Sequence, residues 1–399
     1  MKKNWWIMFE GYATGEDPIL SDVRRSVRTL CSQFPEQYWM EMDLSGSYPT
    51  EFVNEMTKSG WLGLLIPEEY GGGGGSMMAA SVVLEEIHQS GGSAAGCHAQ
   101  MYIMGALLRH GSDEQKARYL PDIASGKMRL QSMAVTEPDA GSDTTQITTR
   151  AELKGDVYLI NGEKVFISRV EHTDLMLVLA RTTMKSEAKS RTHGLSLFVV
   201  DVGAALEAGT LEVSKISTMV NHHSTSLRFN GLVVHERDRI GEQDEGFRYL
   251  LSGLNAERIL ISSESIGDGM YFVRRASEYA TERHVFGRAI GENQGIQFPI
   301  SEAYMHVRAS SFMRDYAATL CERGEPYGSE ANMAKWLSSV AACQAGDIAM
   351  MTFGGYGMAS EYGIERKFRE ARLNLVAPVS NNMVLGHIAT HVLKMPRSF

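Results

Sequence analysis

The chain contains only four cysteines, Cys31, Cys97, Cys321 and Cys343, among its 399 residues. They lie far apart in the sequence and form no C-x-x-C pair, which argues against a disulfide framework. In a chain of this length, the pattern predicts reduced, buried thiols in a reducing compartment. We therefore expect a cytoplasmic protein.

Long apolar runs are also missing, because no segment approaches the roughly 20 apolar residues that a membrane-spanning helix needs. Residues 2–9 superficially resemble a signal peptide, but Glu10 and Asp17 interrupt the pattern and no small-residue cleavage site follows. We interpret residues 1–17 as an N-terminal extension and expect no membrane association.

Positive charge is in deficit: the formal net charge is −9 and the isoelectric point is near 5.8. Nonspecific binding to nucleic acid or to anionic membranes needs a cationic field, so neither partner is expected. The 43% hydrophobic and 22% charged residues are typical of a globular protein.

Several catalytic motifs are absent as well. The sequence has no H-E-x-x-H, no G-x-S-x-G and no G-x-G-x-x-G after a strand. We expect no metal site: His222 and His223 are adjacent, so on a strand they would point to opposite faces, and a solvated loop is the simpler interpretation. The five glycines Gly71–Gly75 lack the following Gly-Lys-Ser/Thr of a phosphate loop, which favours a flexible connection between helices.

What is present divides into three regions. Helical periodicity occupies residues 18–126, with candidate helices at 51–56, 78–89, 101–110 and 114–123. Residues 127–240 read as a mostly antiparallel β domain, with strands at 157–160, 163–168, 175–180, 195–202 and 225–234. Asn161-Gly162 favours a two-residue hairpin turn between the first two of these strands. Residues 241–399 return to helical periodicity, at 247–283, 293–323, 329–352 and 381–394. This order predicts an α+β fold with an N-terminal helical domain, a middle antiparallel β domain and a C-terminal four-helix bundle.

Four segments in this order carry a specific resemblance. The stretch 134–143 reads A-V-T-E-P-D-A-G-S-D, 161–168 reads N-G-E-K-V-F-I-S, 282–288 reads E-R-H-V-F-G-R, and 353–357 reads F-G-G-Y-G. Together they resemble the acyl-CoA dehydrogenase family over roughly residues 20–395. The resemblance implies FAD as cofactor, an acyl-CoA substrate, an electron-transferring flavoprotein as partner, and a homotetramer or homodimer.

The resemblance also implies residue roles. Thr136 would donate a hydrogen bond to the flavin, Phe166 would pack on its ring, Ser168 would donate to the hydride-accepting nitrogen, and Ser142 would face both cofactor and acyl-CoA. Arg283 would reach the FAD pyrophosphate of a neighbouring subunit, where a guanidinium suits phosphate oxygens; the alternative is an ion pair with Glu278 or Glu282. The remaining expected cofactor contacts are Met133, Val135, Phe286, Gln294, Met351, Gly354, Gly355, Ser380 and Asn382.

Two departures from the family pattern stand out. Met351 lies where many relatives have a glutamine that contacts FAD. Arg169-Val170 replaces a common Asn-Gly turn beside the flavin.

The catalytic base is the sharpest expectation. Many relatives place a glutamate in a C-terminal loop, but this chain has Pro378 there, which offers neither a carboxylate nor a backbone N–H. A second subgroup, resembling isovaleryl-CoA and long-chain dehydrogenases, carries the base on the first helix of the C-terminal bundle, where this chain has Glu257. The apolar stripe Phe247, Leu250, Leu254 and Ile261 places Glu257 on a buried face, and desolvation would raise its pKa into a useful range.

The sequence leaves the roles of several residues open. Glu257 could instead form an ion pair that locks the bundle, and Arg258 is either an active-site arginine or its structural partner. Asn255 and Arg258, with Ser142, are the expected substrate contacts. Met101, Tyr102 and Met104 line the acyl pocket or belong to the helix core.

The expected reaction is α,β-dehydrogenation of an acyl-CoA thioester to a trans-2-enoyl-CoA, with Glu257 as base and the hydride passing to the flavin. The alternatives are a flavin oxidase or monooxygenase, an enoyl-CoA reductase, or a flavin-bearing nucleic-acid-binding relative.

Overall fold

The computed structural model describes residues 17–397. The predicted N-terminal extension therefore lies outside the described residues, except for Asp17. The Asp17 carboxylate accepts a hydrogen bond from the Ile19 N–H and caps the first helix, α2 (Pro18–Cys31).

Helices make up the N-terminal region, as predicted. They end at local stop signals: α7, for example, begins with a capping box between Ser112 and Gln115 and ends at Gly126, which has a φ of 75°. The helices after α2 are α3 (Glu36–Ser45), α4 (Thr50–Lys58), α5 (Met77–Gln89), α6 (Ala95–His110) and α7 (Asp113–Ser125).

The glycine run lies between helices, but it is not a loose connection. The N–H groups of Gly73 and Gly75 donate to the carbonyls of Gly63 and Leu64 at 3.0 and 2.7 Å. A Cβ atom at Gly72 would lie 2.2 Å from the Ile66 carbonyl oxygen. The glycines allow this loop to pair closely with residues 63–66, which uses the donors that a phosphate would need.

The middle region forms one eight-stranded sheet in the order β6-β7-β3-β2-β4-β5-β8, with β1 paired to β4. The sheet is largely antiparallel, as predicted, but β1 runs parallel to β4 and makes it mixed. The strands are β1 (Leu130–Ala134), β2 (Arg150–Lys154), β3 (Val157–Ser168), β4 (Leu175–Arg181), β5 (Leu195–Asp201), β6 (Leu211–Lys215), β7 (Ser224–His235) and β8 (Arg239–Ile240).

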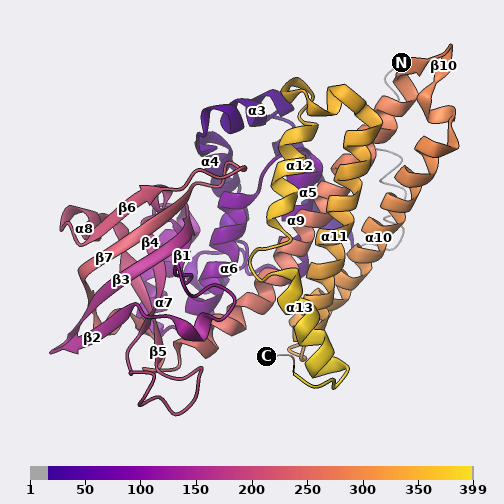
Figure 1. Cartoon of the computed structure of the whole chain (residues 1–399). Coiled ribbons are helices and arrows are strands. Elements are labelled where there is room, and N and C mark those ends of the chain that lie inside the picture. Colours follow the sequence, from indigo (N-terminus) through magenta and orange to yellow (C-terminus); the bar gives the residue numbers. More distant parts are fainter. Residues whose placement is uncertain (1–16, 398–399) are drawn as a thin grey trace.

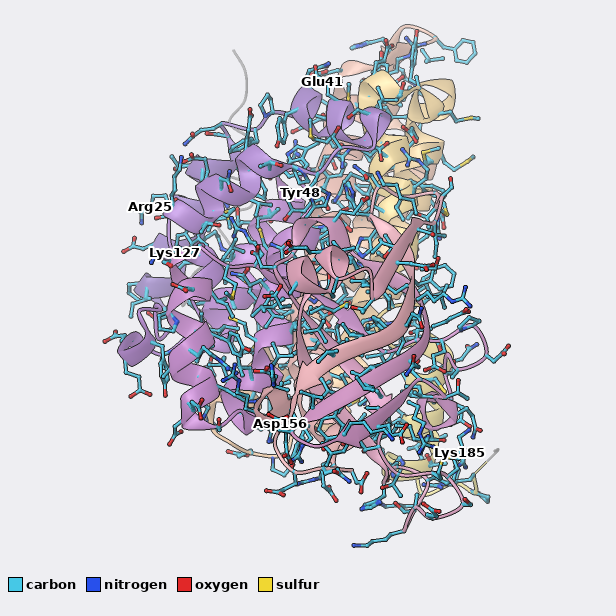
Figure 2. The ribbon with its side chains drawn as sticks, turned by 90° about the vertical axis from the view of Figure 1, so that its left-hand side faces the viewer. Arg25, Glu41, Tyr48, Lys127, Asp156 and Lys185 are labelled. Atoms are coloured by element: carbon cyan, nitrogen blue, oxygen red, sulfur yellow. The ribbon has the colours of Figure 1, made fainter. Side chains whose placement is uncertain are left out.

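The hairpin predicted at Asn161-Gly162 is wrong, because β3 runs through both residues. The Asn161 side chain accepts a hydrogen bond from the Gly231 N–H of β7, and the β3–β7 register shifts between Ile160 and Gly162. The tight turn lies instead between β2 and β3, where Lys154 pairs with Val157; Asp156 marks it at the lower edge of the sheet in Figure 2. The dipeptide Asn161-Gly162, which favours a turn in isolation, thus lies at a register shift within β3.

The C-terminal region is a helical bundle built around the long helix α9 (Gly246–Glu282), which packs against α5 and α6 as well as its own bundle. Figure 1 shows this bundle to the right and the sheet to the left, with the indigo and violet N-terminal helices partly between them. The other helices are α10 (Gln294–Glu322), α11 (Gly328–Phe353), α12 (Ile364–Leu373) and α13 (Asn381–His387).

The predicted helix at 381–394 begins where expected but continues as a π-helical turn over Ile388–Val392. A small hairpin, β9 (His284–Val285) and β10 (Arg288–Ala289), follows α9. None of the helices in residues 17–397 is both long and apolar enough to cross a membrane.

Candidate active site

Glu257 lies in the first third of α9, a helix that packs against α6. Its side chain is 3% exposed. The predicted stripe is confirmed, since Leu250 and Ile261 are buried and Phe247 and Leu254 pack against the same core as Leu250. The Glu257 carboxylate is therefore buried on the apolar face of α9.

No ion pair holds this carboxylate within residues 17–397, and its Oε2 atom has no hydrogen-bond partner. The alternative of a structural ion pair is therefore not realised. Burial raises the pKa of Glu257 to about 7, against the opposing effects of His98, Arg258 and the Tyr102 hydroxyl. A carboxylate with that pKa can accept a proton near neutral pH.

Two residues of α6 face Glu257. His98 and Tyr102 are four residues apart, so they share one face of that helix. Burial and the nearby Glu257 raise the pKa of Tyr102 well above its usual value, so its hydroxyl stays protonated. The sequence did not single out His98, although its i, i+4 spacing from Tyr102 was a usable signal. Met101 and Met104 are buried in the hydrophobic cores, and the Tyr102 hydroxyl lies next to the carboxylate.

A second buried carboxylate, Glu264, lies two turns further along α9. His98 Nδ1 lies 2.8 Å from Glu264 Oε1, and His88 Nε2 lies 3.7 Å from Glu264 Oε2. Burial acts to raise the pKa of Glu264, but the two histidines outweigh it and hold that pKa below its usual value. Glu264 is thus a poor proton acceptor, which leaves Glu257 as the better base.

Behind Glu264, charged side chains are paired with one another. Lys367 Nζ lies 2.5 Å from Asp268 Oδ1 and 2.7 Å from Glu370 Oε2, and His88 Nδ1 lies 2.8 Å from Asp268 Oδ1. The His88, Asp268 and Glu370 side chains could surround a cation, but the Lys367 ammonium already contacts both carboxylates of that group.

The end of β3 offers a surface for a planar ligand. Phe166 adopts a φ of 58° at a register shift in the strand, and its ring is 61% exposed. Such backbone strain clusters at functional sites, and here it turns a large aromatic out of the sheet. Ser168 and Thr136 lie beside it, since the Val165 N–H donates to the Thr136 carbonyl at 2.9 Å and the Ser132 hydroxyl to the Ser168 carbonyl at 2.7 Å. The expected contacts Met133 and Val135 continue along β1 and just beyond it.

Arg169, which follows Ser168, is buried, with 6% of its surface exposed and a φ of 62°. Its Nη1 lies 3.2 Å from His222 Nε2, and its Nε donates to the Gln131 carbonyl at 3.4 Å. The loop assignment for His222 is confirmed, but its solvation is wrong: burial and the charge of Arg169 lower the pKa of His222 to about 3, so its imidazole is neutral.

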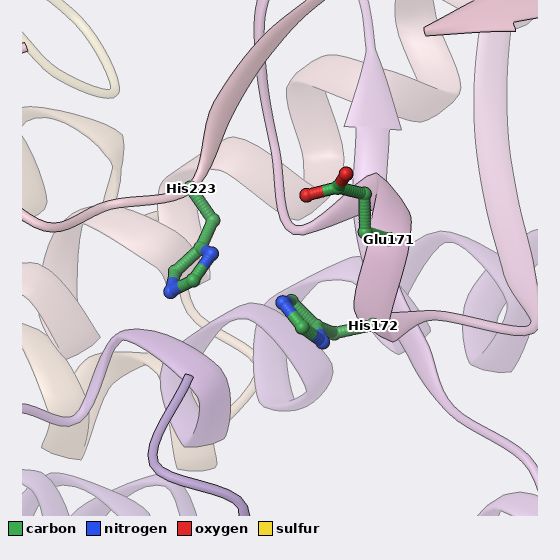
Figure 3. Close-up of side chains that lie close together, drawn as sticks. All are labelled: Glu171, His172 and His223. Carbon is green, nitrogen blue, oxygen red and sulfur yellow. The ribbon is translucent and has the colours of Figure 1, made fainter. Parts of the chain in front are cut away.

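His223 approaches a different group. Figure 3 shows its ring converging with His172 and Glu171 of the short helix after β3. One ligand atom from each of the three lies within 4.8 Å of the others. Lys215 Nζ is 3.5 Å from Glu171, and Tyr48 stacks on His172 with ring centroids 4.2 Å apart. Two of these three side chains therefore already have partners within the protein.

Most of the remaining candidate residues lie in two places. Asn255 and Arg258 lie next to Glu257, with Arg258 Nη1 donating to Asn255 Oδ1 at 2.6 Å, and Ser380 caps α13. Exposed residues form the second set at the far end of the bundle: Arg283, Phe286, Gln294, Met351, Gly354 and Gly355. Ser142 and Asn382 are exposed as well.

These two places are far apart. Because an α-helix rises about 1.5 Å per residue, Arg283 lies roughly 40 Å from Glu257 along α9. Arg283 forms no ion pair with Glu278, which pairs with Arg274 instead, or with Glu282; its guanidinium lies 5.9 Å above the Tyr356 ring. A single subunit thus does not bring all the expected cofactor contacts together.

The helix–sheet–helix order, the buried Glu257 carboxylate and the exposed Phe166 ring at the sheet edge fit an enzyme that binds a planar cofactor. Comparison with known proteins identifies the family. The chain matches the N-terminal, middle and C-terminal domains of acyl-CoA dehydrogenase over residues 20–127, 132–232 and 244–393.

Individual relatives agree. The chain is 33% identical to the acyl-CoA dehydrogenase fadE12 of Mycobacterium bovis, covering 94% of this chain and 96% of the relative. It is 31% identical to the caffeyl-CoA reductase–Etf complex subunit CarC of Acetobacterium woodii, covering 88% and 93%. Its fold is similar to butyryl-CoA dehydrogenase from Megasphaera elsdenii, with a TM-score of 0.88, 26% identity and coverage of 94% and 98%. This chain belongs to the acyl-CoA dehydrogenase family.

It is accordingly an FAD-dependent oxidoreductase that acts on CH–CH bonds. The residues present fit a flavin, because the turned-out Phe166 ring offers a flat contact surface, and Ser168 and Thr136, which both carry hydroxyls, lie next to it along the backbone.

Proposed function

We propose that the protein dehydrogenates an acyl-CoA thioester to the trans-2-enoyl-CoA, with Glu257 as the only catalytic base. The supporting observation is the buried Glu257 carboxylate, which has an unpartnered Oε2 and a pKa raised to about 7. Pro378 occupies the position of the other known base, and the neighbouring Glu264 is held ionised by histidines.

Each residue then has a defined task. Glu257 takes the α-proton of the substrate at Oε2, at a position buried from water. Phe166, Ser168, Thr136, Met133 and Val135 hold the isoalloxazine ring; FAD, when bound, accepts the hydride from the β-carbon. Ser142, Asn255 and Arg258 position the thioester, and Arg258 contributes a buried Nε donor that has no partner within the described chain.

The test is an anaerobic titration of the purified flavoprotein with a panel of acyl-CoA thioesters, followed by bleaching of the flavin absorbance. The wild type should bleach with at least one thioester. Glu257→Gln should retain FAD and slow bleaching by a factor of about 10² to 10⁴, the usual contribution of a general base. Normal bleaching in that variant would refute the assignment.

The reverse direction is the second candidate, because the relative CarC is named a caffeyl-CoA reductase. The same carboxylate would then return a proton to the α-carbon. Chemically reduced enzyme mixed with an enoyl-CoA should be reoxidised rapidly if reduction is the working direction, and rapid reoxidation by oxygen alone would favour an oxidase.

The proposal extends to partners and place. The same relative is named as part of a complex with Etf, which supports an electron-transferring flavoprotein as acceptor. A homotetramer or homodimer is supported by the distance between the two sets of cofactor residues and by an exposed apolar stripe on α10: Phe298, Met305, Phe312 and Tyr316 are each at least 55% exposed. A cytoplasmic location fits the four free cysteines.

A further inference from the structure

The Glu257 carboxylate has to lose a proton after every turnover. A general base leaves each reaction protonated, and the next reaction needs its ionised form. The Glu257 side chain is 3% exposed, so bulk water has little access to it. The side chains around Glu257 therefore decide how fast the proton leaves.

His98 of α6 is the group best placed to receive this proton. His98 and Tyr102 share one face of α6, their ring centroids are 5.0 Å apart, and the Tyr102 hydroxyl lies next to the Glu257 carboxylate. After burial, the charge of His98 has the largest effect on the pKa of Glu257, ahead of that of the adjacent Arg258. Because a Coulomb interaction weakens with distance, this effect agrees with the packing of α6 on α9 in placing His98 close to the carboxylate.

His98 and Glu257 each have one buried atom without a partner. His98 is 6% exposed, and neither its Nε2 nor Glu257 Oε2 has a hydrogen-bond partner within residues 17–397. A neutral imidazole donates through one ring nitrogen and accepts through the other. With its proton on Nδ1, His98 offers Nε2 as an acceptor, and protonated Glu257 offers the donor that such an acceptor needs. Imidazole is also the side chain that takes up and releases protons near neutral pH.

Glu264 sets the direction of the transfer. Its Oε1 lies 2.8 Å from His98 Nδ1, which favours a ring proton on Nδ1. Burial acts to raise the pKa of Glu264, but His98 and His88 hold it below its usual value, so an ionised carboxylate stabilises an imidazolium at His98. Glu264 lies about two turns beyond Glu257 on the same face of α9. The base, the imidazole and the anion thus follow one another along the contact between α6 and α9.

A cavity lies beyond Glu264. Glu264 lines a cavity of about 60 Å³, which has room for water. Several residues, among them His222, line both this cavity and a wider pocket of about 240 Å³. Lys215, whose side chain is 76% exposed, lines the wider pocket, so that pocket reaches the protein surface. A route for a proton therefore leads from the base to the solvent.

We propose that His98, paired with Glu264, takes the α-proton from Glu257 and passes it toward this cavity, so that the base is ionised again. The proton moves from Glu257 Oε2 to His98 Nε2, and the proton on His98 Nδ1 moves to Glu264 Oε1. Glu264 is a poor proton acceptor, so it gives its proton to water in the cavity; one proton leaves and no electrons move. His98 and Glu264 are positioning residues that act through Glu257, and this inference rests on the proposed function.

Exchange of the substrate α-hydrogen with the solvent measures the relay. The straight-chain acyl-CoA thioester that bleaches the wild type fastest is mixed with the flavoprotein in D₂O without oxygen. Mass spectrometry follows deuterium at the α-carbon of the recovered thioester, and stopped-flow absorbance follows the flavin. Deuterium can reach the α-carbon only after the proton on Glu257 has exchanged. The ratio of the deuterium-incorporation rate to the bleaching rate therefore reports the relay, and it does not depend on the amount of folded enzyme.

Variants of the relay residues should lower this ratio. His98→Gln should lower it about 10²-fold, the lower end of the range for a positioned acid or base, while the flavin still bleaches. Glu264→Gln should lower it as well, and the double variant should fall no further than His98→Gln, because both residues act in one chain. His110→Gln is the matched control: His110 is also on α6, but its Nε2 lies 2.7 Å from Ser252 Oγ, so the ratio should not change. Circular dichroism and FAD content establish that each variant is folded.

The outcomes separate the relay from the dehydrogenation. An unchanged ratio in His98→Gln would overturn the relay, as would single effects that multiply in the double variant. Exchange that persists in Glu257→Gln would reject the base and the relay together. Deuterium incorporation that needs both Glu257 and His98, without bleaching by any thioester, would support the relay and reject the dehydrogenation.

Discussion

Burial and partnership decide the chemistry of each carboxylate on α9. Glu257 and Glu264 are both buried, and each has one carboxylate oxygen without a hydrogen-bond partner in the described residues, but histidine nitrogens lie 2.8 and 3.7 Å from Glu264. The pKa of Glu264 is therefore held below its usual value, so Glu264 stays ionised. The pKa of Glu257 is raised to about 7.

That pKa predicts the pH dependence of the reaction. Only the ionised form of Glu257 can take the α-proton, so the rate of flavin bleaching should rise with pH through about 7 and level off above it. Stopped-flow bleaching at saturating acyl-CoA, measured from pH 5.5 to 9, reports this directly. A rate that falls over the same interval would mean that the group works as an acid.

The raised pKa of Glu257 also predicts that the free energy of unfolding falls as the pH rises. A folded-state pKa raised from 4.5 to about 7 favours the protonated carboxyl, so this contribution is complete below pH 4.5 and is lost as pH rises through 7. Glu257→Gln, which is neutral throughout, should exceed the wild type in free energy of unfolding at pH 8 by on the order of 3 kcal/mol and match it near pH 4.5. Denaturant titrations at both pH values measure the difference, with the exposed Glu114→Gln as control; a pH-independent difference would count against the shift.

At the scale of elements, periodicity predicted most of the molecule. The long helices α9, α10 and α11 begin and end within one or two residues of the predicted bounds, because each buries an apolar stripe between recognisable breaks. The middle strands β4, β5 and β7 were predicted for the same reason. The face of α9 that carries Glu257 was also predictable.

Local signals failed where tertiary contacts overrode them. Asn161-Gly162 favours a turn in isolation, but the Asn161 side chain is used to bond Gly231 on the neighbouring strand, and the chain continues straight. The polar environment of Arg169 could not be predicted from the sequence either. It is formed by Gln131, His222 and Tyr48, which come from three separate segments. Only the departure from the Asn-Gly pattern marked that position in the sequence.

The bulge at Gly162 gives a test of this account. A Cβ atom there would lie 2.5 Å from Thr149 Oγ1 and 2.7 Å from Thr149 Cα, at a φ of 148°. Gly162→Ala should therefore lower the free energy of unfolding by about 3 kcal/mol, combining overpacking with backbone strain. Gly155→Ala is the control: Gly155 also has a positive φ, of 66°, but open space around it, so about 1 kcal/mol is expected. Chemical denaturation followed by circular dichroism distinguishes them, and equal costs would contradict the steric explanation.

At the scale of the whole molecule, the expected cofactor residues form two separate sets, one around β1 and the end of β3 and the other beyond the C-terminal end of α9. Figure 1 shows the β9–β10 hairpin, next to Arg283, at the top of the bundle, far from the sheet. If both sets bind flavin, as proposed, one subunit would offer them to two different flavins. The exposed stripe on α10 supplies a surface through which a second copy could bring its Arg283 to the first subunit's FAD.

Disrupting that stripe should release FAD along with the partner subunit. Phe312 is 65% exposed in the middle of α10, and Phe312→Asp should lower the mass measured by analytical ultracentrifugation and reduce the flavin content per chain at least about 10-fold, because an unpaired carboxylate in an apolar interface is strongly disfavoured. Leu153→Asp, at a 44% exposed position on β2, should leave both unchanged. A smaller species that keeps its FAD would show that each subunit binds the cofactor alone.

Complementation between two defective subunits tests the shared site more directly. Arg283→Ala keeps the base but loses the guanidinium, and Glu257→Gln loses the base but keeps the guanidinium. If Arg283 acts across the interface, a mixed dimer contains one site with both groups intact, so refolding the two variants together in equal amounts should restore roughly a quarter of the wild-type bleaching rate. If Arg283 acts within its own subunit, no mixed site is complete and the activity stays at the sum of the separate variants. The gain on mixing therefore depends on the interface itself, and a general loss of stability in either variant would not produce it.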